Sequence, residues 1–252
     1  MNEWALVLGA SSGFGAATAR ELARAGFHIA GVHMDRRETL PLAQQTIDDI
    51  RCAGRETLFY NCNAADEGER KCVIAGLAGK SVQVLFHSLA FGSLKPMVGA
   101  DAATQRQIEM TADVMGHSLI YWARDLVDAG LMRAGGRIFA MTSEGSTHAL
   151  PSYGPVSAAK AVLEAHIRQL AVELAPFGIT ANALLAGTTD TPALRKIPGH
   201  ERLLEYALSR NPHKRLTVPE DIARAVVSLA APNTAWLTGN TIRVDGGEGI
   251  AG

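Results

Sequence analysis

Short apolar runs alternate with longer amphipathic stretches along the whole chain. The runs have the length of buried strands and are rich in Val, Ile and Leu, as expected for strands covered on both faces. The predicted strands are Trp4–Leu8, His28–His33, Glu56–Tyr60, Val82–His87, Gly136–Thr142, Thr180–Leu185 and Thr241–Val244.

The stretches between these runs carry apolar residues at helical spacing. The predicted helices are 14–25, 39–53, 66–79, 101–132, 156–175 and 219–230. Strands that alternate with helices predict a mostly parallel sheet with right-handed crossovers and helices on both faces. No internal repeat or linker interrupts the pattern. We therefore expect residues 1–252 to form a single α/β domain, a Rossmann-type doubly wound parallel sheet.

The segment 187–217 departs from this alternation. It contains three prolines and a short charged stretch with helical spacing near 200–210. It follows a strand whose carboxyl end should face a cofactor crevice, and such insertions often cover a substrate. The sequence therefore predicts a substrate loop here, and an ordinary surface loop remains the alternative.

Composition narrows the classes of function. The chain has 252 residues, a net charge of −1 and 47% hydrophobic residues. Such a balance gives no electrostatic footprint for nucleic acid or a membrane surface, so we expect neither partner. No targeting segment or membrane-length apolar run is present, and a cytoplasmic location is expected. The three cysteines fit no zinc spacing, and they are expected to be unpaired, buried or half-buried thiols. The histidines form no ligand spacing either, so no metal site is predicted.

A glycine-rich turn joins the first predicted strand to the first predicted helix. Glycines allow a tight turn and let the backbone approach a pyrophosphate, which the amides of the helix N-terminus can bind. Its position within a strand–turn–helix unit makes this a specific signal for a dinucleotide. The candidate cofactor-binding residues are Gly9, Ser11, Ser12, Gly13, Phe14 and Gly15.

The second predicted strand ends at Asp35-Arg36-Arg37, where a dinucleotide fold meets the adenosine ribose. An acid there favours a free 2′-hydroxyl, whereas arginines favour a 2′-phosphate. The two arginines favour NADPH, with NADH as the alternative. Arg36 and Arg37 are also compatible with a solvated helix start that binds no cofactor.

Tyr153 and Lys160 stand seven residues apart at the start of a predicted helix. Seven residues are nearly two turns, so the two side chains can share one face. Pro155 is tolerated only in a first turn, which places the helix start close to Tyr153. An ammonium near a phenol is expected to lower the pKa of Tyr153 and to prepare it for acid–base work. A surface pair without a function is the alternative.

Taken together, these motifs resemble the short-chain dehydrogenase/reductase family over residues 3–247. The resemblance also includes Thr142-Ser143, Val172-Glu173-Leu174, Gly178–Asn182 and Val244–Gly247. The spacing of Tyr153 from Lys160 is three residues wider than in common members, and it resembles the divergent enoyl-[acyl-carrier-protein] reductases.

Further positions resemble that branch. His87-Ser88-Leu89-Ala90-Phe91 is similar to its His-Ser-Ile-Gly-Phe motif, and Asp113 stands near the usual active-site asparagine. Ser143 departs from the second tyrosine of the main enoyl reductases. The first glycine turn is of the common type, as in the NADPH-dependent enoyl reductases that keep that turn.

The resemblance implies reduction of a trans-2-enoyl thioester, either a small molecule or an acyl-carrier conjugate, in fatty acid synthesis. It assigns catalytic roles to Tyr153, Lys160 and Ser143, with Lys160 also holding the nicotinamide ribose. It implies a homotetramer as well. The further cofactor-binding residues that it implies are Asn63, Ala64, Ser88, Leu89, Ala90, Gly187, Thr189 and Thr191. Two alternatives stay open: a ketone or alcohol oxidoreductase and a non-catalytic dinucleotide-binding protein.

Overall fold

The chain folds around one parallel sheet of seven strands in the order β3-β2-β1-β4-β5-β6-β7. This computed structural model describes residues 3–251. Each predicted strand is present, and no bound differs from the prediction by more than one residue. The strands are β1 Glu3–Leu8, β2 His28–His33, β3 Thr57–Asn61, β4 Ser81–His87, β5 Arg137–Thr142, β6 Thr180–Ala186 and β7 Thr241–Val244.

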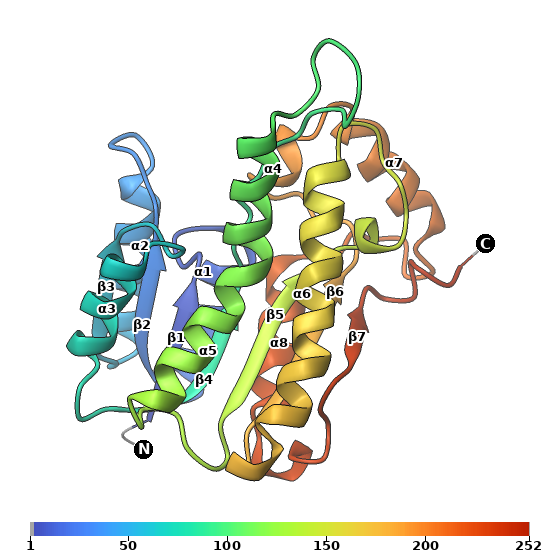
Figure 1. Ribbon diagram of the computed structural model, residues 1–252. Helices are drawn as coiled ribbons and strands as arrows, with labels where there is room; N and C mark the ends of the chain where they lie inside the picture. Colours follow the sequence, from blue (N-terminus) through green and yellow to red (C-terminus); the bar gives the residue numbers. More distant parts are fainter. Residues whose placement is uncertain (1–2, 252) are drawn as a thin grey trace.

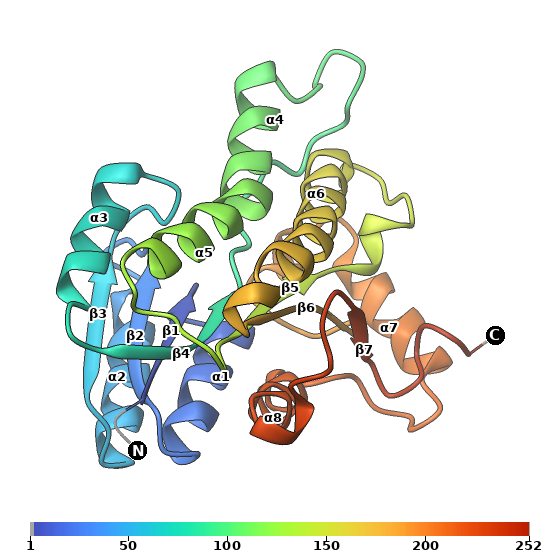
Figure 2. The same cartoon turned by 60° about the horizontal axis from the view of Figure 1, so that its bottom comes forward.

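Helices cover both faces of this sheet, and Figure 2 shows the two layers on opposite sides of it. One layer contains α1, α2 and α8, and the other contains α3, α5 and α6. The predicted doubly wound architecture is therefore confirmed. The helices are α1 Gly13–Arg24, α2 Leu40–Cys52, α3 Glu67–Gly76, α4 Gln105–Ala112, α5 Ser118–Asp128, α6 Gly154–Glu173, α7 His200–Arg210 and α8 Pro219–Leu229.

The core has two parts because strand side chains alternate between the faces. On β1, Leu6 and Leu8 pack toward α3, α5 and α6, whereas Ala5 and Val7 pack toward α1, α2 and α8. Each of these four side chains is fully buried. β1 is therefore a central strand, and its carboxyl end is held rigidly between the two layers.

The prediction of one continuous helix over 101–132 is wrong. The structure has α4, then a π-helical segment, η1 Asp113–His117, and then α5. At the start, Thr104 and Gln107 form a capping box that fixes the first turn. A Cβ at Gly116 would crowd Val162 and the Ala159 carbonyl oxygen, so the backbone of η1 lies close to α6 at this residue. A π-helical turn of this kind is wider than an α-helical one.

The strand order reverses between β1 and β4, because β2 and β3 lie on one side of β1 and the later strands on the other. In open parallel sheets, ligands bind beyond the carboxyl ends of strands at such a reversal. In Figure 1 these ends point toward the part of the molecule where α4 begins and where α7 lies. A ligand site is therefore expected beyond the carboxyl ends of β1 and β4.

The three thiols are free, but Cys52 and Cys72 are exposed and only Cys62 is half-buried, so the expected burial is wrong for two of them. Cys52 is the last residue of α2, Cys62 follows β3 and Cys72 lies on α3. Over residues 3–251, no helix combines the length and apolarity that crossing a membrane requires. Nor does that part of the chain gather three or more metal-binding side chains.

Candidate active site

The glycine turn after β1 is shaped to approach a ligand closely. Gly9 and Gly13 have φ angles of +88° and +53°, which side chains rarely tolerate. A Cβ at Gly9 would overlap the Ser88 carbonyl oxygen, and one at Gly15 would overlap the Gly9 carbonyl oxygen. The absent side chains therefore let the turn pack directly against the backbone at the ends of β1 and β4, a close approach that only glycine permits.

Helix α1 begins within this turn, at Gly13. Its N-cap residue Ser12 makes no side-chain capping bond, and the first intrahelical bond runs from the Ala16 amide to the Ser12 carbonyl. Among residues 3–251 the preceding amides of Gly13, Phe14 and Gly15 have no hydrogen-bond acceptor, as is usual for the first turn of a helix, where the amides carry a partial positive charge. These donors fit a phosphate group.

The end of β4 and the loop after β6 border the same turn. The Ser88 amide donates to the Leu8 carbonyl at 2.9 Å, which places Ser88 and Leu89 beside Gly9, and Ala90 follows them in the chain. The Thr191 side chain lies next to Gly13, within 3.9 Å of the Cβ position. Thr189 is buried, and its hydroxyl donates to the Gly187 carbonyl at 2.8 Å. The structure thus brings these predicted residues together around the turn.

Beyond the end of β2, Asp35 turns inward, whereas Arg36 and Arg37 are exposed. The Asp35 carboxylate is 2.9 Å from His33 Nδ1. Burial alone would raise the pKa of Asp35, but hydrogen bonds from Thr39, Ser11 and His33 hold this pKa below its ordinary value. Asp35 is therefore ionised near neutral pH and engaged with partners inside the protein.

Residues at the end of β3 support this corner. Asn61 binds both the amide and the carbonyl of Asp35, at 2.9 and 3.0 Å, which sequence reasoning did not foresee. The Asn63 side chain accepts from the Ala65 amide at 3.0 Å and closes a turn. Ala64 is buried, and its carbonyl accepts from Trp122 Nε1 at 2.8 Å. Contact of Asn63 and Ala64 with an adenine remains a prediction.

Tyr153 and Lys160 converge on the carboxyl end of β5. Tyr153 is the N-cap residue of α6, so the predicted helix start is confirmed. Its hydroxyl donates to Ser143 Oγ at 3.3 Å, directly after β5. The Lys160 ammonium donates to the Met141 carbonyl at 2.8 Å and the Leu89 carbonyl at 3.4 Å. Ser152, just before Tyr153, has φ +58°, a strained conformation of the kind that gathers at functional sites.

The expected effect of Lys160 on Tyr153 is corrected by the structure. Burial raises the pKa of Tyr153, and the Ser143 hydrogen bond opposes this only in part. The ammonium is directed at the carbonyls of Met141, on β5, and Leu89, just after β4, rather than at the phenol. Tyr153 is therefore a protonated hydrogen-bond donor at neutral pH.

Lys160 is buried, and desolvation lowers its pKa to about 8 while the Glu164 carboxylate opposes that change. Glu164 lies one turn later on α6 and accepts from Thr142 Oγ1 at 2.6 Å. Sequence reasoning missed Glu164, although a residue four positions after a functional lysine shares its helix face.

His87 and Asp113, two residues of the family resemblance, have structural partners. His87 is fully buried, with Nε2 2.8 Å from Ser118 Oγ, and desolvation lowers its pKa to about 3. It is therefore neutral at physiological pH. Asp113 accepts from the Tyr121 hydroxyl at 2.9 Å and lines a surface depression with Arg106 and His117.

Comparison with known proteins decides the family. Residues 9–248 match the family model described as enoyl-(acyl carrier protein) reductase. The chain belongs to the short-chain dehydrogenase/reductase family, in its branch of enoyl-(acyl carrier protein) reductase-like members. The family supports an NAD(P)-dependent reductase, and the binding of the dinucleotide in the crevice described above remains a prediction.

Two relatives and one solved structure match nearly the whole chain. The 1-cyclohexenylcarbonyl-CoA reductase of Streptomyces collinus is 29% identical over 97% of this chain and 86% of its own. The NADH-dependent enoyl-[acyl-carrier-protein] reductase of Aquifex aeolicus is 27% identical over 90% and 84%. The crystal structure of the Aquifex enzyme superposes with a TM-score of 0.86 at 24% identity, over 99% of this chain and 97% of that one. This last match supports the fold.

Proposed function

We propose that this enzyme reduces the carbon–carbon double bond of a trans-2-enoyl thioester. The observation that carries the proposal is the Tyr153 hydroxyl held on Ser143 directly after β5, where the buried Lys160 ammonium binds the Met141 carbonyl. Enoyl reduction needs a hydrogen-bond donor at the thioester oxygen, where negative charge develops. A relative named for 1-cyclohexenylcarbonyl-CoA, an unsaturated thioester, supports this choice.

Each residue of the site has a part in this reaction. A reduced dinucleotide, held with its pyrophosphate at the glycine turn, would supply a hydride to the β-carbon. Tyr153 donates a hydrogen bond to the thioester oxygen and stabilises the enolate charge, and a proton from solvent then completes the product at the α-carbon. Ser143 orients both the Tyr153 hydroxyl and the substrate carbonyl. The Lys160 cation binds the nicotinamide ribose hydroxyls and keeps the local field positive, while Thr189 and Thr191 contact the carboxamide or the pyrophosphate.

NADPH is the proposed reductant, as the arginines after β2 indicate. The Asp35 carboxylate already forms hydrogen bonds with His33, Ser11 and Thr39. Arg36 and Arg37 are exposed, and neither forms an ion pair with any residue of 3–251. Free guanidinium groups at this position suit a 2′-phosphate.

The deciding experiment offers crotonyl thioester and acetoacetyl thioester in parallel, each with NADPH and with NADH, and follows oxidation of the cofactor by absorbance. We expect the crotonyl thioester with NADPH to be consumed fastest. If only the acetoacetyl thioester is reduced, Tyr153 serves ketone reduction and the enoyl proposal is wrong.

We also propose that the enzyme works as a homotetramer. Large apolar side chains are exposed late in α6, before β6 and before β7, with Val172 at 71%, Phe177 at 53% and Trp236 at 98%. Association with other copies of the chain would remove such side chains from water, which is favourable. Sedimentation equilibrium gives the assembly mass, and a monomeric mass at micromolar concentration contradicts the proposal.

A further inference from the structure

The two ends of the loop 187–217 meet at a buried acid from the chain's last segment. Glu248 follows β7 and is only 5% exposed. A Cβ at Gly187 would press against Glu248 Oε2 and would overlap Thr217 Oγ1. The first residue of the loop, its last residue and Glu248 are therefore packed against one another.

Glu248 holds the start of the loop by direct hydrogen bonds. Its carboxylate accepts from the Thr188 hydroxyl at 2.7 Å and from the Thr188 amide at 3.1 Å. A buried carboxylate is costly unless donors satisfy it, and charge-assisted bonds of this kind are strong. Thr188 is thus fixed by a residue sixty positions later in the chain.

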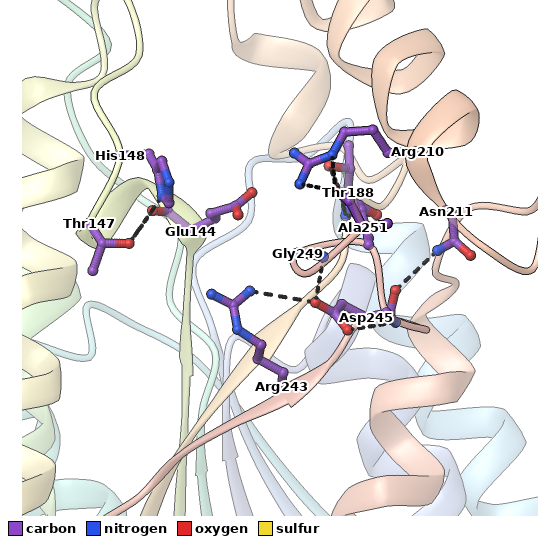
Figure 3. Close-up of polar contacts among 12 residues, drawn as sticks. Glu144, Thr147, His148, Thr188, Arg210, Asn211, Arg243, Asp245, Gly249 and Ala251 are labelled. Carbon is purple, nitrogen blue, oxygen red and sulfur yellow. Dashed lines mark hydrogen bonds and ion pairs between the residues drawn. The ribbon is translucent and has the colours of Figure 1, made fainter.

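The segment that carries Glu248 is itself well ordered by its own contacts. The Asp245 carboxylate accepts from the amides of Gly247 and Gly249 at 2.9 and 3.0 Å, and Arg243 lies 3.5 Å from it. Figure 3 shows Arg243 and Gly249 meeting at the same oxygen of the Asp245 carboxylate. The turn after β7 therefore presents Glu248 from a firm base.

The later part of the loop binds the same segment. Arg210, at the end of α7, donates to the Ala251 carbonyl at 2.9 Å, and Asn211 donates to the Asp245 carbonyl at 3.0 Å. Figure 3 shows Thr188, Arg210 and Asn211 gathered around these residues. Residues 245–251, which we name the C-terminal latch, therefore hold the loop near both of its ends.

The held end of the loop leads directly to the cofactor crevice. Thr189 follows Thr188 and is buried, and Thr191 lies beside Gly13 of the glycine turn. Since Thr188 and Thr191 are three residues apart, a shift at Thr188 displaces the residues that border the crevice. The Glu248 carboxylate is engaged with the amide and hydroxyl of Thr188, so we place its action in the loop.

We propose that Glu248 is a positioning residue that fastens the loop 187–217 over the active site. The role in binding rests on the proposed function, while the fastening itself rests on the contacts above. Loss of the latch should loosen the loop and weaken binding of NADPH and thioester. It should leave the barrier from the bound complex to the transition state, which Tyr153 lowers, largely unchanged. The expected signature is a raised KM with a nearly constant kcat.

The test compares Glu248→Ala, Glu248→Gln and, as a matched control, Glu220→Ala, an exposed acid on α8. Glutamine keeps one oxygen that can accept from Thr188, so it should rescue most of the effect. In Glu248→Ala we expect KM for NADPH and for crotonyl thioester to rise about tenfold, with kcat within about twofold, the loss expected for one charge-assisted bond. Hydrogen exchange, measured without substrate, should quicken in residues 188–216 only.

The outcomes separate the two proposals. If the wild-type enzyme reduces no thioester, the proposed function fails, and hydrogen exchange alone decides the latch. Unchanged exchange in Glu248→Ala overturns it. Exchange that quickens throughout the sheet, or a glutamine variant as impaired as the alanine one, makes Glu248 a structural residue only and also overturns it. If Glu248→Ala does not fold, Thr188→Val removes the 2.7 Å bond from the other side and must give the same selective loosening.

Discussion

The two sides of the sheet position their functional groups by different means. Beside β1 and β2 the cradle is backbone, made by Gly9, Gly13 and Gly15 and the free amides of α1. Beside β5, β6 and β7 the groups are side chains held by other side chains, Tyr153 by Ser143 ten positions earlier and Thr188 by Glu248 sixty positions later. A backbone site tolerates almost no added atom, whereas a side-chain site depends on single polar contacts.

The largest effect should come from removing the Tyr153 hydroxyl on the side-chain half. Tyr153→Phe should lower kcat by about 10²- to 10⁴-fold, because the donor to the thioester oxygen is lost. Binding of NADPH, measured by fluorescence titration, should change little because the backbone half is untouched. The control is Tyr60→Phe on the edge strand β3. Turnover that survives in Tyr153→Phe would show that another group stabilises the enolate.

A single added methyl group at Gly9 should disrupt the glycine turn beside β1 and β2. In Gly9→Ala the new Cβ would overlap the Ser88 carbonyl at a φ of +88°, so the turn must distort. We expect the free energy of unfolding to fall by about 2 kcal/mol or more and NADPH binding to be lost. Thermal unfolding and fluorescence titration measure these two quantities.

Gly54→Ala is the matched control for Gly9→Ala. Gly54 also has a positive φ, +73°, but nothing lies within 4 Å of its Cβ position. It therefore carries the cost of the conformation without the overlap. Equal losses in the two variants would mean that backbone strain, and not close approach to Ser88, makes the turn intolerant.

This comparison also explains what the sequence could predict. The strands, the glycine turn and the start of α6 at Tyr153 depend on local signals: apolar runs, glycines and a proline in the first helical turn. All were predicted to within a few residues. The break of the helix at η1 was missed, because it depends on Gly116 packing against α6, more than forty positions away.

The site residues divide in the same way. The sequence places Tyr153 and Lys160 at the crevice. The partners of the Lys160 ammonium and the direction of the pKa change of Tyr153 depend on contacts that no local pattern reveals. The Lys160 ammonium binds the carbonyls of Met141 and Leu89, and burial raises the pKa of Tyr153. Glu248 carried no signal at all, since its partner Thr188 lies sixty residues earlier.

A smaller effect is expected from the charge of Lys160 as pH rises. Burial lowers its pKa to about 8, so the cation that holds the cofactor is lost above that pH. The activity should therefore fall about tenfold per pH unit above 8, the slope of a single deprotonation. His87 does not contribute, because its pKa is about 3, and the raised pKa of Tyr153 keeps the phenol protonated.

Stability should move in the opposite direction over the same range. Between about pH 8 and 10.5, the unfolded chain binds a proton at Lys160 that the folded chain has lost, so the free energy of unfolding gains from this group as pH rises. Urea unfolding of the wild type and of Lys160→Met measures this contribution to the free energy of unfolding, because the variant lacks the titrating amine. If this contribution falls with rising pH together with the activity, the lowered pKa of Lys160 is wrong.

The smallest effect tests whether side chains matter on the backbone half at all. Arg36 and Arg37 are exposed and without ion pairs among residues 3–251, so they should serve only a 2′-phosphate. The double variant Arg36→Ala/Arg37→Ala should raise KM for NADPH about five- to tenfold and leave KM for NADH unchanged. Arg168→Ala, an exposed arginine of α6, is the control for charge alone. If KM rises equally for both cofactors, the arginines support the fold of this corner, and the ionised Asp35 then favours NADH as the physiological reductant.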